Sequence, residues 1–438
     1  MYKKFYRKKG RRMTFVRRLS LFKIDAKELW SFLFAIVLIL DCRSMYGEMS
    51  ITPSWWNMGL LFLLIISSAG LISTNRMSKY KLLKGLSFLI VITMYFLFYG
   101  LMKPDNLQNI VVYGSGFIII FLTCYLIDED DRKGLILKYR DIICVIAVVS
   151  LFFWISGSLL KILGPSGYIY SKWSGSYNMI AVPNYWYLFF EPQTSSLAGT
   201  FIQLLPRNSA IFTEGPMASL NFSIALMVTL FIEKNINVKK RNILIIAILS
   251  TLSATGYIYI LLALGIKVLS NSNRNKISKL LYLVIGVILL LLTIYFTNFI
   301  IGQKLNNGMS GNLRLDDYLA SLKAWKNAPF LGVGLGNDVY IYPYMNTMRA
   351  MVNMLGLSNS LFVFLAEGGI YFMFPMIIIY TYKIRTSISS KNYNYLYVIM
   401  SVIYFSILYI FVYQYVMFFL LNYIFIENGV KEEKNNYE

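Results

Sequence analysis

The sequence predicts an all-α, polytopic integral membrane protein. Of its 438 residues, 57% are hydrophobic and only 14% are charged, well below the roughly 25% of charged residues in a soluble globular protein. Apolar runs long enough to cross a hydrocarbon core, about 20 residues each, recur between residues 29 and 426. We expect one helical bundle of about 10 to 12 transmembrane helices over 29–426, with tails at 1–28 and 427–438.

The basic residues orient this bundle. Thirty of the 42 Lys and Arg residues lie in six segments, and the connections between those segments contain only ten over a much greater length. This is the asymmetry that keeps basic loops in the cytoplasm, so we expect a cytoplasmic N-terminus. The net charge of +21 is then explained by topology and by attraction to anionic lipid, and no nucleic-acid partner is expected. The basic segments are 1–28, 76–84, 132–140, 234–241, 267–279 and 383–391.

The apolar runs give the expected elements in chain order. Two connections are long enough to form external loops, 164–214 and 302–358. Three cysteines at or within helices indicate neither a disulfide framework nor a metal site. No histidine is present, which excludes any mechanism that needs imidazole, and no metal or other cofactor is expected. Spans are expected at 29–46, 54–73, 82–102, 108–127, 141–163, 215–232, 280–301 and 359–382.

Two further apolar runs do not fit a single crossing. The run 242–269 has basic clusters at both ends, which both favour the cytoplasm, and its middle contains the polar break SATG at 253–256. We predict two short half-helices or a re-entrant hairpin, which requires protein or a wet cavity to cover the irregular backbone. The run 395–426 is long for one span and short for two, so whether it crosses once or twice is left open.

The external loops carry aromatic, acidic and glycine-rich features. Trp173 and Trp186 belong either to an aromatic belt at the membrane interface or to a platform for sugars. Arg314 opens a helical pattern with Leu315, Leu319, Leu322 and Trp325 on one face, which predicts an amphipathic helix on the membrane surface. GVGLGN at 332–337 follows Pro329 rather than a buried strand, so it predicts a turn or flexible backbone near a ligand and not a nucleotide site.

Charged residues near the membrane are costly, and four of them require a reason. In RNSAIFTEGP, residues 207–216, Thr213 could cap the next helix, and Glu214 would then be favoured by the helix dipole. Arg207 either pairs with Glu214 in a salt bridge or binds an anionic ligand. Arg314 raises the same question in the second loop. Glu367 is expected to mark a polar interior with a partner that the sequence does not identify.

Three stretches together resemble the O-antigen polymerase and O-antigen ligase superfamily. They are RNSAIFTEGP before a helix, the pattern R-x(10)-W-x(3)-P-x(2)-G-x-G-x-G at 314–336, and SNSLFVFLAEGG at 358–369. The resemblance implies a membrane glycosyltransferase of GT-C-like architecture that uses polyprenyl-diphosphate-linked glycans. Ligases of this superfamily typically have a histidine where this chain has Ser358, before Asn359, so the resemblance favours the Wzy-type polymerases of O-antigen, capsule or exopolysaccharide.

The resemblance implies a role for each candidate residue. Arg207 and Arg314 would bind the leaving diphosphate, and Glu214 would be the base that accepts a proton from the attacking hydroxyl. The expected substrate-binding residues are Arg349, Asp316, Asp317, Asn359, Glu367, Trp173 and Trp186.

The implied setting is the cytoplasmic membrane of a bacterium, with the active site on the periplasmic or extracellular side. The expected partners are a polyprenyl-diphosphate-linked oligosaccharide, membrane lipid, and a chain-length regulator and flippase of the same pathway. Two alternatives are a ligase that transfers finished glycan to another acceptor and a flippase for lipid-linked oligosaccharides.

Overall fold

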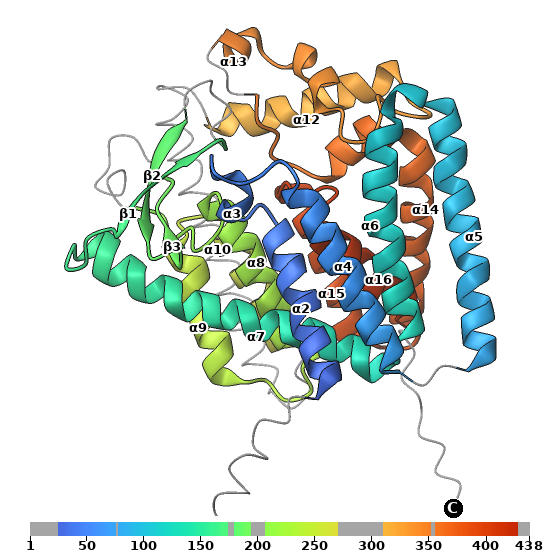
Figure 1. Cartoon of the computed structure of the whole chain (residues 1–438), viewed down its shortest axis with the longest axis horizontal. Coiled ribbons are helices and arrows are strands. Elements are labelled where there is room, and N and C mark those ends of the chain that lie inside the picture. The colour runs from blue at the N-terminus through green and yellow to red at the C-terminus, as the bar shows by residue number, and fades with distance from the viewer. Residues whose placement is uncertain are drawn as a thin grey trace, which may run out of the picture.

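The computed structural model describes residues 25–75, 78–173, 179–193, 206–269, 310–351 and 355–427. These residues form a helical bundle with one small sheet, which confirms the predicted all-α membrane fold (Figure 1). Among them, six helices are long and apolar enough to cross a membrane. They are α4 (Trp56–Ser73), α5 (Lys79–Met102), α6 (Leu107–Leu126), α7 (Glu129–Phe153), α8 (Gly215–Met227) and α14 (Leu361–Ser389), with α6, α7 and α8 extended by the turns η2 (Pro104–Asn106), η3 (Trp154–Leu159) and η5 (Val228–Ile232). The span expected at 280–301 lies outside the described residues.

The first predicted span is shorter than expected. Helix α2 (Ala26–Asp41) ends five residues before the predicted limit at 46, and the turn α3 (Met45–Glu48) follows it. The reason is a contact that the local sequence does not reveal. The Asp41 carboxylate accepts the backbone N–H of Tyr415 at 2.6 Å, at the start of another helix, and Arg43 adopts a left-handed φ of 47°.

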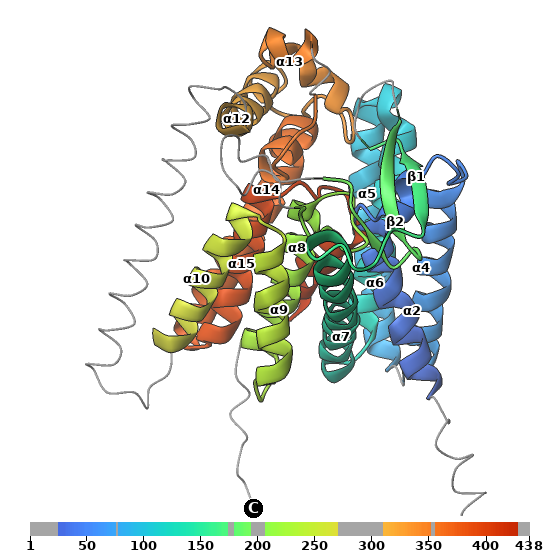
Figure 2. The same ribbon diagram turned by 90° about the vertical axis from the view of Figure 1, so that its left-hand side faces the viewer.

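Both ambiguous apolar runs fold as pairs of short helices. The break predicted near 253–256 is confirmed, because α9 (Val238–Ser250) and α10 (Ala254–Leu269) reverse direction at 251–253, where Leu252 has a φ of 50°. Figure 2 shows α9 and α10 side by side. The run 395–426 forms α15 (Tyr393–Leu408) and α16 (Tyr415–Ile426), with a non-helical break between them.

The first external loop contains a sheet where the sequence predicted an irregular segment at the membrane interface. Strands β1 (Gly167–Ser171), β2 (Ile180–Tyr185) and β3 (Phe189–Phe190) are antiparallel in that order. Ile169 and Val182 lie opposite each other and pack with Phe190 on Met45 of α3 and on Met49 directly after it. This packing covers the segment after α2 and fixes its position.

Helix α12 (Ser310–Asn327) crosses one end of the bundle, with α13 (Thr347–Met351) beyond it (Figures 1 and 2). The short turns η6 (Asp338–Tyr340) and η7 (Tyr342–Tyr344) lie in the segment between them. Ala320 and Ala324 of α12 are buried in a cluster with Val363 of α14, whereas Leu315 and Leu319 are exposed. Trp325, from the same predicted apolar face, packs on this cluster, so only the part of that face around Leu315 and Leu319 is open to a membrane surface.

Helix α8 lies at the centre of the bundle, with buried residues on all of its faces. Its small polar side chains have partners on neighbouring helices: Asn221 accepts the hydroxyl of Tyr139 at 2.6 Å, and Ser219 lies 3.2 Å from the Tyr409 hydroxyl. Burial on all faces and these hydrogen bonds fix the N-terminus of α8, where the candidate site is found.

Candidate functional site

The segment before α8 is held between two other non-helical segments of the chain. On one side, Asn208 donates its backbone N–H to Ser250 at 3.1 Å and its side-chain amide to the Ser250 hydroxyl at 2.8 Å. On the other side, Met45 donates to Ile211 at 2.8 Å. Residues 207–214 are therefore held against the α9–α10 turn and against the segment that follows α2.

Glu214 occupies the N-cap position of α8, so the predicted capping by Thr213 is wrong. Glu214 has extended backbone angles and makes no side-chain capping bond, while the hydroxyl oxygen of Thr213 is buried without a hydrogen-bond partner. Pro216 lies in the first turn, as expected. Because the carboxylate does not cap the helix, it is available for another task beside the positive end of the α8 dipole.

Arg207 passes directly over the start of α8. A Cβ atom added at Gly215 would lie 3.3 Å from both Cβ and Cδ of Arg207 and 2.9 Å from the carbonyl oxygen of Thr251, so only glycine leaves this path open. The Arg207 Nε is buried and has no hydrogen-bond partner among the residues that the structure describes. Within the described part of the chain Arg207 forms no ion pair, so the predicted salt bridge to Glu214 is not formed.

Several charges act on Glu214 from different parts of the chain. Burial raises the pKa of the Glu214 carboxyl, and this effect is opposed by Arg43, Arg207 and Arg314 and by a hydrogen bond with the Gln193 side chain. Burial likewise lowers the pKa of the Arg207 guanidinium, and the negative charge of Glu214 opposes this effect. Arg207 lies against the start of α8, and the charges of Arg207 and Arg314 both act on the Glu214 carboxyl. Within the described residues neither guanidinium forms an ion pair with a carboxylate, and such a pair of cations beside a half-buried carboxylate is suited to an anion.

Arg43 was missed by the sequence analysis. It follows α2 directly, and its carbonyl accepts the N–H of Thr213 at 3.1 Å, which places it one residue from Glu214 across the contact. A usable signal was present, because Arg43 is the only basic residue between 41 and 53 and is one of the few in an external connection. A charge at the outer side of the membrane is costly, so Arg43 requires a functional or structural reason, as Arg207 and Arg314 do.

Three other predicted site residues lie together in a separate cluster. Arg349 of α13 contacts Asp316 at 2.9 Å and Asp317 at 2.6 Å, and the Ser358 hydroxyl donates to Asp317 at 2.5 Å. Arg349 is 5% exposed and Asp317 is 2% exposed. The pairing satisfies these charges internally and ties α13 to α12, while the substrate-binding roles remain predictions.

Arg349→Ala is expected to destabilise the protein by about 3–5 kcal/mol, because it leaves Asp317 buried without its cation. Thermal unfolding of the purified protein measures this, with Lys323→Ala on the exposed face of α12 as the control. A normal melting temperature combined with lost activity would instead assign Arg349 to substrate binding.

The partner of Glu367 is the glycine-rich turn. Its carboxylate accepts the N–H of Gly336 at 2.8 Å, and its backbone carbonyl accepts Gly334 at 2.9 Å and the Tyr99 hydroxyl at 3.0 Å. GVGLGN is thus a turn wrapped around the outer part of α14. Asn359 is fully buried just before α14, where its side chain accepts the N–H of Phe362 at 3.1 Å.

Gly332→Ala is expected to lower the melting temperature. Gly332 has a φ of 67°, and a Cβ atom there would overlap the Glu367 carbonyl, so both backbone strain and a collision with backbone result. Gly164→Ala, in open space at an ordinary φ, is the matched control. Equal stability of the two variants would show that the turn does not pack on α14 in this way.

The two predicted tryptophans lie in the sheet region. Trp173 follows β1 and is half-buried, with its backbone N–H 3.1 Å from the Ser171 hydroxyl. Trp186 is 55% exposed, and its ring packs 5.8 Å from that of Phe153 at the end of α7. Their role in an interface belt or in a platform for sugars remains a prediction.

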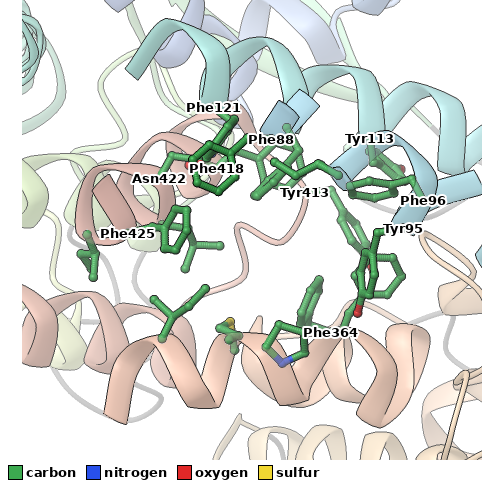
Figure 3. A pocket seen from close by; sticks show the side chains of 18 of the residues that line it. Phe88, Tyr95, Phe96, Tyr113, Phe121, Phe364, Tyr413, Phe418, Asn422 and Phe425 are labelled. Atoms are coloured by element: carbon green, nitrogen blue, oxygen red, sulfur yellow. The ribbon is translucent and has the colours of Figure 1, made fainter. Parts of the chain in front are cut away.

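A largely apolar cavity of about 400 Å³ lies between α5, α6, α14 and α16 (Figure 3). Aromatic side chains line most of it, and Leu335 of the glycine-rich turn and Tyr413 of the α15–α16 break are among its lining residues. The cavity therefore reaches the turn that Glu367 holds. Labelled lining residues in Figure 3 are Phe88, Tyr95, Phe96, Tyr113, Phe121, Phe364, Tyr413, Phe418, Asn422 and Phe425.

Comparison with known proteins gives one match, which covers the second half of the site. Residues 242–374 match the model of a protein family described as O-antigen ligase. This segment runs from α9 to α14 and contains Arg314, the glycine-rich turn and most of the Glu367 environment. Nothing among the curated proteins or the solved structures matches the chain. The match at 242–374 confirms the resemblance to the O-antigen polymerase and ligase superfamily over that segment, and the apolar helices are those of a multi-pass membrane protein.

Proposed function

We propose that the protein is a polysaccharide polymerase, which transfers a growing glycan from polyprenyl diphosphate onto a lipid-linked repeat unit at the outer leaflet of the cytoplasmic membrane. One observation carries the proposal. Arg207 and Arg314, from two separate segments of the chain, both act on Glu214, and within the described residues neither has a carboxylate ion-pair partner.

The chemistry assigns a task to each of the three residues. The acceptor hydroxyl oxygen attacks the anomeric carbon of the donor glycan, the bond from that carbon to the diphosphate oxygen breaks, and polyprenyl diphosphate leaves. Arg207 and Arg314 meet the negative charge on the leaving group with charge-assisted hydrogen bonds, worth roughly 1.5–3 kcal/mol each. Glu214 accepts the hydroxyl proton, and its raised pKa makes it a better base near neutral pH.

The apolar cavity supports the lipid part of this assignment. Its walls are almost entirely aromatic and aliphatic, and it lies between helices that would be embedded in the bilayer. An isoprenoid chain packed there would have its attachment point near the glycine-rich turn, at the same end of the bundle as α12. The cytoplasmic orientation of the opposite end, and action together with a chain-length regulator and a flippase, belong to the same proposal.

A polymerase is favoured over a ligase by the residue at position 358. Ser358 stands where ligases of the superfamily typically have histidine, and its hydroxyl is engaged with Asp317. Analysis of glycans in a strain lacking the protein separates the two activities. Loss of a polymerase leaves single lipid-linked repeat units, whereas loss of a ligase leaves long lipid-linked polymer.

Purified protein in detergent, supplied with polyprenyl-diphosphate-linked repeat units, tests the proposal. We expect a ladder of lipid-linked products separated by one repeat unit, because extension needs no sealed membrane. No extension in detergent together with movement of the same substrate across sealed vesicles would identify a flippase instead.

A further inference from the structure

The segment after α2 is held more tightly than a simple connection requires. Asp41 accepts the N–H of Tyr415 at 2.6 Å, and Cys42 lies 3.4 Å from the side-chain amide of Asn221. The carbonyl of Arg43 and the N–H of Met45 bond to residues 213 and 211 at 3.1 and 2.8 Å. Four contacts with three different elements therefore fix residues 41–45.

Arg43 is strained in this arrangement. Its φ of 47° is in the left-handed region, which non-glycine residues rarely adopt. Strained residues of this kind persist only when their surroundings over-determine them, and they cluster at functional sites. Glycine would adopt this backbone conformation without strain, yet the position is occupied by an arginine.

The backbone contact with Thr213 places Arg43 beside the start of α8. Its charge acts on Glu214, on Tyr342 of η7 and on Glu48. It is half-buried, and it forms no ion pair with any carboxylate among the described residues. Among the cations that act on Glu214, it has the largest effect.

We propose that Arg43 is a third guanidinium of the diphosphate site, fixed by residues 41–45 so that the site distinguishes a diphosphate from a monophosphate. This inference rests on the proposed function. Arg43, Arg207 and Arg314 around an ionised Glu214 leave a net charge of +2, whereas Arg207 and Arg314 alone would leave +1. A glycan-linked polyprenyl diphosphate has two phosphoryl groups, so the third guanidinium supplies hydrogen-bond donors to the second group, which a monophosphate lacks.

The test compares binding of polyprenyl diphosphate and polyprenyl monophosphate by purified Arg43→Gly protein. Glycine suits the left-handed backbone, so this variant loses the side chain while it relieves the strain, and its melting temperature should not fall. We expect about ten- to a hundredfold weaker diphosphate binding, the loss of a charge-assisted contact, and less than about threefold change for monophosphate. Lys161→Gly is the matched control, since Lys161 is an exposed cation with a φ of 54° just after η3, and this variant should bind both lipids normally.

Arg43→Gln gives an independent readout. The groups that face Glu214 are Arg43, Arg207, Arg314 and Gln193, and removal of Arg43 takes away one influence that lowers the Glu214 pKa. The acid limb of the rate profile should therefore move to higher pH, which a merely structural role would not cause. The role of Arg43 would be overturned by one combination of results: the wild-type protein extends chains, and the Arg43→Gly variant binds polyprenyl diphosphate as tightly as the wild type. Wild-type protein that binds neither lipid would overturn the proposed function itself.

Discussion

Arg207→Lys is expected to lower the rate of chain extension by about a hundredfold or more, although it preserves the charge. An ammonium group cannot reproduce the planar fork that binds two phosphate oxygens, and two lost charge-assisted hydrogen bonds correspond to about 3 kcal/mol or more. Within the described residues the buried Nε of Arg207 has no hydrogen-bond partner, so this donor is available to a ligand. Product length on a polysaccharide gel, and the rate of extension in detergent, measure the effect.

The control for Arg207 is Arg385→Lys, which makes the same exchange at an exposed position near the other end of α14. It should leave extension unchanged. Full-length polymer at the normal rate from Arg207→Lys would remove Arg207 from the diphosphate site.

Glu214→Gln is expected to stop extension beyond one repeat unit while the protein stays folded. The amide keeps the size and hydrogen bonding of the side chain but cannot accept the proton. Burial raises the Glu214 pKa, so the ionised carboxylate is the costlier form in the fold and the neutral amide should unfold at the same or a higher temperature. In the wild type the rate should fall as the pH drops through this raised pKa, because only the deprotonated carboxyl acts as a base.

Glu48→Gln is the control for Glu214. The pKa of Glu48 is also raised by burial and opposed by Arg43, but Arg207 and Arg314 are not among the charges that act on it. Its removal should leave chain length and the acid limb of the profile unchanged. Normal chain lengths from Glu214→Gln would leave the carboxylate with a structural task only.

The sequence predicted the spans well where hydropathy alone decides them. Helices α4, α5, α6 and α8 begin and end close to the predicted limits, and the polar break in the α9–α10 run was predicted from charge. The early end of α2 was not predictable, because it depends on Asp41 capping a helix that begins 374 residues later. The small sheet was missed because its strands are short and lie within a polar, aromatic loop.

The candidate site shows the same division. The cost of charge at the membrane predicted Arg207, Glu214 and Arg314, and in the structure both arginines are among the charges that act on Glu214. Their catalytic roles stay predictions. The same argument could not separate these from Arg349 and Glu367, whose partners are an acidic pair on α12 and a backbone N–H in a distant turn. Such pairings depend on tertiary contacts and are not visible in local sequence.

A double-mutant cycle between Arg207 and Arg314 tests the central claim most directly, namely that both arginines bind the same diphosphate. Extension rates would be measured for Arg207→Lys, Arg314→Lys and the double variant. If both act on one leaving group, the combined loss should differ from the sum of the single losses by about 0.5–3 kcal/mol. Losses that add to within about 0.5 kcal/mol, as expected for independent residues, would contradict a shared site.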